Sequence, residues 1–233
     1  MTRSAAKNWT TRLLLIAGTA VGPWFIVLSL LQAVTRPGFD ITKHEVSLLL
    51  VGSLGWVQTI NFLVTGSLGI AFAVGLRRLL HPGKAGTWGP ILVGAFGLLF
   101  LVAGIWHPDP QLGFPTGAPE GVPPIQSAPS NIHSLAFSAL ALAIVAAAVV
   151  FVRKFAADHD RAWAILSSVF AVAIIIFVAA GSALLTTGHG GLSLLGAAIA
   201  ITGWVSATAF HLLRREDSAR TGPSPRLERT AQP

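Results

Sequence analysis

The 233-residue chain contains no cysteine, which excludes disulfide bonds, thiol catalysis and thiolate metal sites. Charge is scarce as well, because Asp, Glu, Lys and Arg make up only 11% of the residues, against 53% that are hydrophobic. About a quarter of the residues in a typical soluble domain are charged. The two shortages together exclude an ordinary soluble domain and indicate an integral membrane protein.

The few basic residues are distributed unevenly along the chain. Six long apolar stretches divide it, and the basic residues lie almost entirely in every second segment between these stretches. Arg36 and Lys43 are the exceptions, so 14 of the 16 Lys and Arg share one side. By the positive-inside rule this side is the cytoplasm, which predicts a multi-pass protein of the plasma (inner) membrane with both termini cytoplasmic. The net charge of +7 then predicts contacts with lipid headgroups and argues against nucleic-acid binding.

The apolar stretches have the length of transmembrane helices, for which about 20 residues suffice. A β-barrel is excluded because its strands would be shorter and would alternate in polarity. The fold prediction is therefore an all-α transmembrane bundle with a short interfacial helix at about 46–53. Its six spans are expected at about 13–34, 56–76, 88–106, 133–152, 163–186 and 192–213.

A single membrane domain, 13–213, follows from these spans. A cytoplasmic segment, 1–12, precedes it, and a charged tail, 214–233, has so few apolar residues to bury that we expect disorder. Helices in lipid pack through small residues, and the pattern Gly18-x-x-x-Gly22 is one of several here. These faces predict packing within the chain, and a homo-oligomer is the alternative.

One polar cluster on the outer side follows the first span. Asp40, His44 and Ser47 fall at helical spacing and can share one face. Either these residues cap the short helix and solvate the membrane surface, or they belong to a functional site.

A second cluster lies in the outer loop 107–131, which has seven prolines and no Lys or Arg. Loops of this length in compact proteins are often functional. Asp109 and His133 are candidates for a catalytic base or for ligands of a divalent metal such as zinc, with His44 and His189 as further ligands. No HExxH pattern supports a metal site, so the alternative is structural, with Asp109 bonded to loop amides and His133 at a helix start.

Polar residues also lie inside the second span. Gln58, Asn61 and Thr65 follow one helical face. Such side chains usually bond to neighbouring helices, and a substrate path is the alternative. The predicted span interiors contain no acidic or basic residue, which weakens a proton-coupled mechanism.

Two stretches resemble the signatures of a bacterial and archaeal membrane family catalogued as domain of unknown function 998. The first runs from Arg36 through Asp40, His44 and Ser47 to Asn61. The second runs from Gly104 through the loop and ends at His133, and its loop positions include Asp109, Pro110, Gly113, Pro115 and Gly117. The resemblance covers about 13–213 and implies a six-span membrane bundle, without an activity.

Three functions remain open from the sequence. The first is a non-catalytic role in sensing, assembly or envelope maintenance, with a polar pocket facing outward. The second is a transporter of a small apolar or amphipathic solute along the Gln58, Asn61 and Thr65 face. The third is a metal-assisted hydrolase of a lipid-like substrate, with Asp109 and His133 at its centre. Membrane lipids are the expected partners, and the ligand is unidentified.

Overall fold

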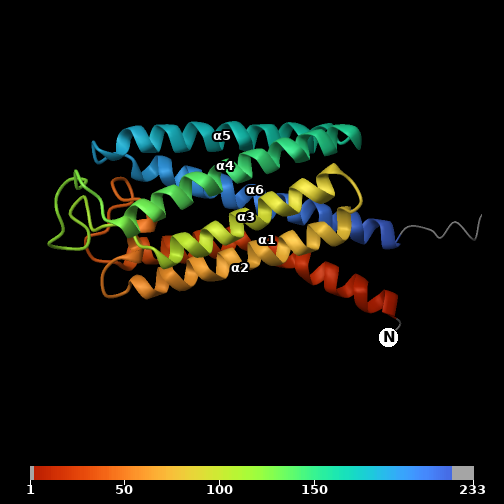
Figure 1. Cartoon of the computed structure of the whole chain (residues 1–233), viewed down its shortest axis with the longest axis horizontal. Helices are drawn as coiled ribbons and strands as arrows, with labels where there is room; N and C mark the ends of the chain where they lie inside the picture. Colours follow the sequence, from red (N-terminus) through yellow and green to blue (C-terminus); the bar gives the residue numbers. More distant parts are fainter. Residues whose placement is uncertain (1–2, 222–233) are drawn as a thin grey trace, which may run out of the picture.

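The computed structural model describes residues 3–221, which form six long α-helices and one short 3₁₀ helix (Figure 1). All six α-helices are long and apolar enough to cross a membrane, so the predicted six-span all-α bundle is confirmed. Their bounds are α1 Arg3–Thr35, α2 Gly55–Leu80, α3 Lys84–Ile105, α4 Ala128–Ala157, α5 Arg161–Leu185 and α6 Gly191–Thr221, and the 3₁₀ helix η1 is Val46–Leu50.

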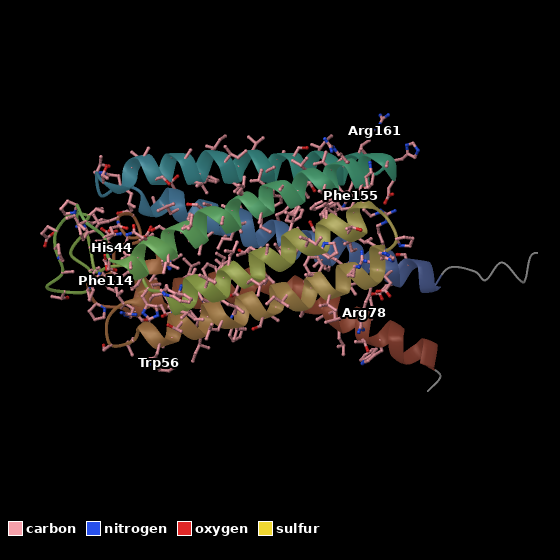
Figure 2. The ribbon with its side chains drawn as sticks, in the orientation of Figure 1. His44, Trp56, Arg78, Phe114, Phe155 and Arg161 are labelled. Carbon is pink, nitrogen blue, oxygen red and sulfur yellow. The ribbon has the colours of Figure 1, made fainter. Side chains whose placement is uncertain are left out.

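The two ends of the bundle differ in structure and in charge. We call the end formed by residues 36–54, 106–127 and 186–190 the cap end. We call the other, with turns 81–83 and 158–160 and the outer parts of α1 and α6, the terminal end (Figure 1). Arg78 and Arg161 lie at the terminal end, whereas the exposed ring of Trp56 lies at the cap end (Figure 2). The charge asymmetry of the sequence is therefore an asymmetry between the two ends.

The six helices form a closed ring of neighbours. Each packs against the helices before and after it in the chain, and α1 packs against α6 to close the ring. The contact between α4 and α6 is slight, because α5 lies alongside both of them. Large apolar side chains project outward from the helices, as for Leu142 on α4 (70% exposed) and Ile175 on α5 (56%). Such outward apolar surface suits contact with lipid.

Small residues set the closest helix approaches. The Gly22 amide donates to Ser206 Oγ of α6 at 2.8 Å, and a side chain at Gly18 would meet Ala209 at 2.7 Å. The Gly18-x-x-x-Gly22 pattern therefore packs within the chain, against α6. On the next pair of helices, a Cβ at Gly66 of α2 would lie 2.6 Å from the carbonyl oxygen of Gly97 on α3.

A polar clamp joins α5 and α6 at the terminal end. Asp160 accepts a hydrogen bond from the Trp163 amide and so caps the start of α5, and its other oxygen lies 2.9 Å from His211 Nε2. The His211 ring stacks on Trp163 with centroids 4.1 Å apart. Arg215 adds an ion pair to Asp158 at 3.1 Å. The 158–160 turn is thereby held against α6.

Some boundaries differ from those expected. The helix η1 stands where a short helix was predicted, with four of its five side chains buried, and its interfacial position stays a prediction. At the other end of the chain α6 continues to Thr221, past the predicted boundary at residue 213. The ion pair of Asp217 with Arg12 at 3.2 Å ties this extension to α1. The rest of the tail predicted to be disordered, 222–233, lies outside the described residues.

We expect Gly97→Ala to destabilise the bundle, because its Cβ would come within 2.7 Å of the Gly66 carbonyl oxygen and force α2 and α3 apart. Overpacking of this kind typically costs about 1–3 kcal/mol. Gly94→Ala is the matched control on α3, since its Cβ would meet Ala73 at an ordinary 3.6 Å. Thermal unfolding of the detergent-purified variants checks this, and equal midpoints for the two would contradict the packing.

Candidate functional site

The cap end is held by a buried arginine. Arg36, at the exit of α1, donates from Nη1 to the Leu49 carbonyl at 3.1 Å and from Nη2 to the Val51 carbonyl at 2.6 Å. Its guanidinium also lies 5.3 Å from the ring centre of Phe114, which comes from the loop before α4. Burial lowers the pKa of Arg36 below its ordinary value, yet arginine remains charged in proteins. Arg36 thus satisfies the last carbonyls of η1 and joins the two cap loops.

His44 makes a second connection between the loops. Its Nδ1 accepts from the Asp40 amide at 2.9 Å, so its Nε2 carries the proton and donates to the Leu112 carbonyl at 2.9 Å. The ring lies between Phe39 and Phe114, with centroid distances of 5.2 and 5.5 Å. Both nitrogens of His44 are therefore occupied by backbone groups.

Two carboxylates of the cap end, Asp40 and Asp109, also bond locally. Asp40 Oδ1 accepts from the amide of Thr42 at 2.9 Å and from its hydroxyl at 2.7 Å, and these hydrogen bonds lower the pKa of Asp40. Asp109 accepts from the amide of Ser127 at 2.7 Å and from its hydroxyl at 2.6 Å. Ser127 is the N-cap of α4, so Asp109 fixes the start of that helix.

The loop residues of the second signature form a tight turn. Gly113 and Gly117 have φ values of +80° and +94°, which favour glycine, and Gly113 donates to the Pro119 carbonyl at 2.8 Å. Pro115 lies beside Gly52, and Pro110 lines a shallow surface pocket with Trp56. This geometry carries Phe114 into the cap, where its side chain is buried.

The polar face of α2 lies against α1 and η1. Gln58 Nε2 donates to Ser29 Oγ at 3.0 Å and to the Val46 carbonyl at 3.2 Å, and its Oε1 accepts from Gln32. Asn61 Nδ2 lies 3.1 Å from each of three oxygens, Phe25 O, Ser29 Oγ and Gln58 Oε1. We call this group the amide junction. It holds η1 onto the first two helices.

Thr65 completes the predicted face one turn deeper. Its hydroxyl donates to the Asn61 carbonyl at 2.7 Å, within its own helix, and its side chain is fully buried.

The outer histidines do not converge on one point. His189 is exposed in the turn between α5 and α6, and His107 Nε2 lies 3.2 Å from Thr59 Oγ1. Within residues 3–221, no group of three or more His, Cys, Asp or Glu could hold a metal ion. The zinc ligands His44, Asp109, His133 and His189 stay a prediction from the sequence.

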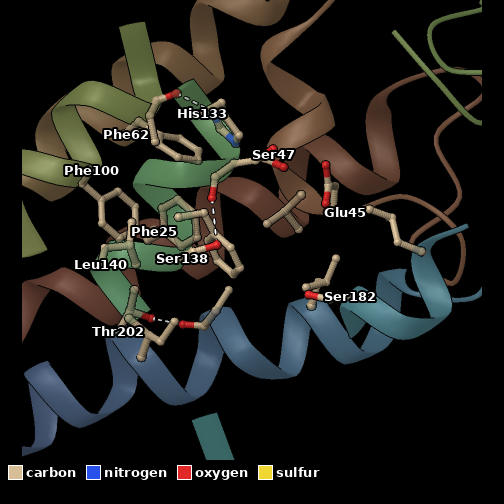
Figure 3. Close-up of a pocket in the computed structure, with 18 residues that line it drawn as sticks. Phe25, Glu45, Ser47, Phe62, Phe100, His133, Ser138, Leu140, Ser182 and Thr202 are labelled. Atoms are coloured by element: carbon tan, nitrogen blue, oxygen red, sulfur yellow. Dashed lines mark hydrogen bonds between the residues drawn. The ribbon is translucent and has the colours of Figure 1, made fainter. Parts of the chain in front are cut away.

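His133 has one nitrogen fixed and one free. Its Nδ1 lies 2.8 Å from the Ala103 carbonyl and 2.9 Å from the Trp106 carbonyl. Because carbonyl oxygens only accept, Nδ1 carries a proton, and in the neutral ring Nε2 is an acceptor. Among the described residues Nε2 has no hydrogen-bond partner, and the ring lines a pocket (Figure 3).

This pocket is lined by η1 and by side chains from all six helices, and its volume is about 190 Å³. An engineered apolar cavity of about 150 Å³ binds benzene, so there is space here for a larger organic group. Figure 3 shows Glu45, Ser47 and Ser182 on one side of the pocket and Phe25, Phe100 and Leu140 on the other, where Ser138 and Thr202 also lie. The apolar end is formed by Phe25, Phe62, Phe100, Leu140 and Ile201.

The polar end of the pocket has an unpaired carboxyl group. Glu45 lies beside Ser47 and faces the pocket, with Ser182 of α5 across from it (Figure 3). Burial raises the pKa of Glu45, and a hydrogen bond from Ser47 offsets part of that effect. Among the side chains that the structure describes, those of residues 9–218, no Lys or Arg forms an ion pair with Glu45. In the sequence Glu45 belongs to the first outer cluster and to the first signature, between His44 and Ser47, but it is not among the predicted site residues.

Exposed side chains of α4 and α5 line the pocket near the cap end, where the two helices diverge (Figure 1). Ser134 and Ser138 of α4 and Ser182 of α5 all line the pocket, and all three are exposed on the surface. The pocket therefore opens on the side of the bundle, near the cap end.

The family model described as "Protein of unknown function (DUF998)" matches residues 19–211, a range that begins within α1 and ends within α6. The chain belongs to this family. The resemblance seen in the two signatures is thereby confirmed, and within this DUF998 chain both signatures meet in the cap around Arg36, His44 and Phe114. No curated protein and no solved structure matches the chain.

We expect Asp109→Ala and Ser127→Ala each to lower the unfolding midpoint, since losing a helix cap costs about 0.5–2 kcal/mol. The double variant should lose less than the sum, because both changes remove the bond from the Ser127 hydroxyl to Asp109. Glu120→Ala is the control, as this loop carboxylate is 90% exposed and its only ion pair, to Lys43, is long at 3.9 Å. Full additivity in thermal unfolding would contradict the shared cap.

Proposed function

We propose that this protein is a non-catalytic plasma-membrane protein that binds an amphiphile with one alkyl chain, taken laterally from the outer leaflet. The observation that carries the proposal is the pocket with one polar and one apolar end, whose mouth lies on the side of the bundle. An amphiphile has the same two parts, and ligand pockets combine an apolar lining with a few placed polar groups. The role that suits such a site is sensing or envelope maintenance.

The orientation follows from charge. The terminal end bears the basic residues, so the positive-inside rule assigns it to the cytoplasm and the cap end to the outside. The mouth, close to the cap end, then lies at the depth of the outer leaflet. Trp56, exposed at the cap end, suits the headgroup level there.

A binding function accounts for more of the observed contacts than transport or hydrolysis does. The amide nitrogens of Gln58 and Asn61 are occupied by partners on α1, α2 and η1, which favours a packing role for that face. Asp109 is likewise occupied by Ser127. Glu45 and the free nitrogen of His133, in contrast, face a pocket that can admit a ligand.

The orientation can be tested with single cysteines, because the natural chain has none. We expect Glu120→Cys, at the cap end, to react with a membrane-impermeant maleimide added to intact cells. Lys84→Cys, exposed at the terminal end, should react only after the cells are permeabilised. The reverse labelling pattern would overturn the assignment of the two ends.

The pocket can be tested with a photoreactive ten-carbon alcohol whose diazirine is at the end of the chain. In nanodiscs of zwitterionic lipid, we expect it to crosslink to pocket residues such as Phe137 and Leu140, mapped by mass spectrometry. Ser138→Trp should reduce this labelling about tenfold or more, since the loss of about 1.4 kcal/mol of binding suffices for that. The reason is that the indole would fill the mouth of the pocket.

Ser67→Trp is the matched control for this experiment. Ser67 of α2 and Ser138 of α4 are both exposed and both donate to the carbonyl four residues earlier, at 2.8 and 2.9 Å, but only Ser138 lines the pocket. Equal labelling of the two variants, or crosslinks spread evenly over the lipid-facing surface, would contradict the proposal.

A further inference from the structure

We propose that the pocket selects amphiphiles with a cationic headgroup, an amine or a quaternary ammonium, and that Glu45 is the counter-ion. This inference rests on the proposed function and names the ligand class of the same site. It begins from the polar end of the pocket, where the available groups can accept hydrogen bonds or bear negative charge.

No cation lines this pocket among residues 3–221. Its polar lining consists of one carboxyl, one imidazole and hydroxyl groups, the last from serines and Thr202. The two basic residues of the cap are engaged elsewhere. Arg36 binds the carbonyls of Leu49 and Val51, and Lys43 lies 3.9 Å from Glu120. An anionic headgroup would therefore meet Glu45 with no charge to balance it.

A cationic headgroup would supply the opposite charge that Glu45 lacks. Glu45 is half-buried, and a carboxyl partly removed from water without an opposite charge is unfavourable in its ionised form, in agreement with its raised pKa. A positive headgroup beside it favours the ionised form and is itself stabilised. His133 Nε2 and the Ser47 and Ser182 hydroxyls can accept hydrogen bonds from an ammonium group.

The overall charge of the protein works in the opposite direction. With a net charge of +7, the long-range field of the chain repels cations and attracts anions. A preference for cationic amphiphiles must therefore come from groups in the pocket. A preference for cationic over anionic probes is therefore a sharp test of the inference.

The experiment uses three photoreactive ten-carbon probes with trimethylammonium, hydroxyl and sulfate headgroups, in nanodiscs of zwitterionic lipid containing the full chain. We expect the ammonium probe to label the pocket at a concentration about tenfold lower than the hydroxyl probe, with the sulfate probe weakest. Tetramethylammonium, which has the same headgroup without a chain, should compete weakly if the ligand is a membrane amphiphile. Strong competition would point to a free amine and overturn the amphiphile class.

Glu45→Gln separates charge from shape. We expect it to abolish the advantage of the ammonium probe and to leave labelling by the hydroxyl probe unchanged. Glu120→Gln, a carboxyl at the same end that does not line the pocket, should leave the order of the three probes as in the natural chain. Glu45→Gln should also raise the unfolding midpoint of the ligand-free protein at neutral pH, because it removes a half-buried carboxyl that has no opposite charge beside it.

The outcomes distinguish the two proposals. If the hydroxyl probe labels the pocket of the natural chain but all headgroups label equally, or Glu45→Gln retains the ammonium preference, the headgroup inference is overturned and the pocket stands. If no probe labels the pocket, the proposed function fails first.

Discussion

The amide junction is the interaction on which the cap end depends. A buried amide that loses its hydrogen bonds is costly, so Gln58 and Asn61 restrict α1, α2 and η1 to positions that satisfy their nitrogens. The bond from Gln58 to the Val46 carbonyl has the widest consequence, since Val46 lies between Glu45 and Ser47. Fixing that carbonyl places the flanking carboxyl and hydroxyl over the pocket.

The pocket itself comes from a difference between the two ends of α4 and α5. At the terminal end, Asp158 and Asp160 bind Arg215 and His211 of α6, which holds the short turn between α4 and α5 in place. At the cap end no such turn connects these two helices, because α4 begins after the long loop fixed by Asp109. Helices joined at one end and separately anchored at the other can diverge, and the space between them becomes the mouth.

The sequence predicts the part of this structure that local physics determines. Length and hydropathy are properties of each apolar stretch, so the six helices could be found without knowing how they pack. Helix ends were harder, because α6 extends past residue 213 through a contact between Asp217 and Arg12, which are distant in the chain. In the loop 107–131, Gly113 and Gly117 adopt positive φ values, which glycine permits, so these turns depend on local sequence.

The candidate site was less predictable, since it depends on which residues meet. Asp109 and His133 attracted attention because their types can bind metals. In the structure Asp109 bonds to a helix cap, while His133 retains one free nitrogen. Glu45 belongs to no pattern with a known chemical role. Its place at the pocket depends on how η1 packs and on the divergence of α4 and α5. No local pattern encodes that combination.

The energetics of Glu45 argue that the pocket is a site and not a packing defect. A void formed by imperfect packing would be expected to have an apolar lining, since a carboxyl removed from water without an opposite charge lowers stability. Glu45 is half-buried, and the hydrogen bond from Ser47 offsets only part of that cost. The carboxyl, its hydroxyl neighbour and the free imidazole nitrogen are arranged around a space that a ligand, and no side chain of the described residues, can fill.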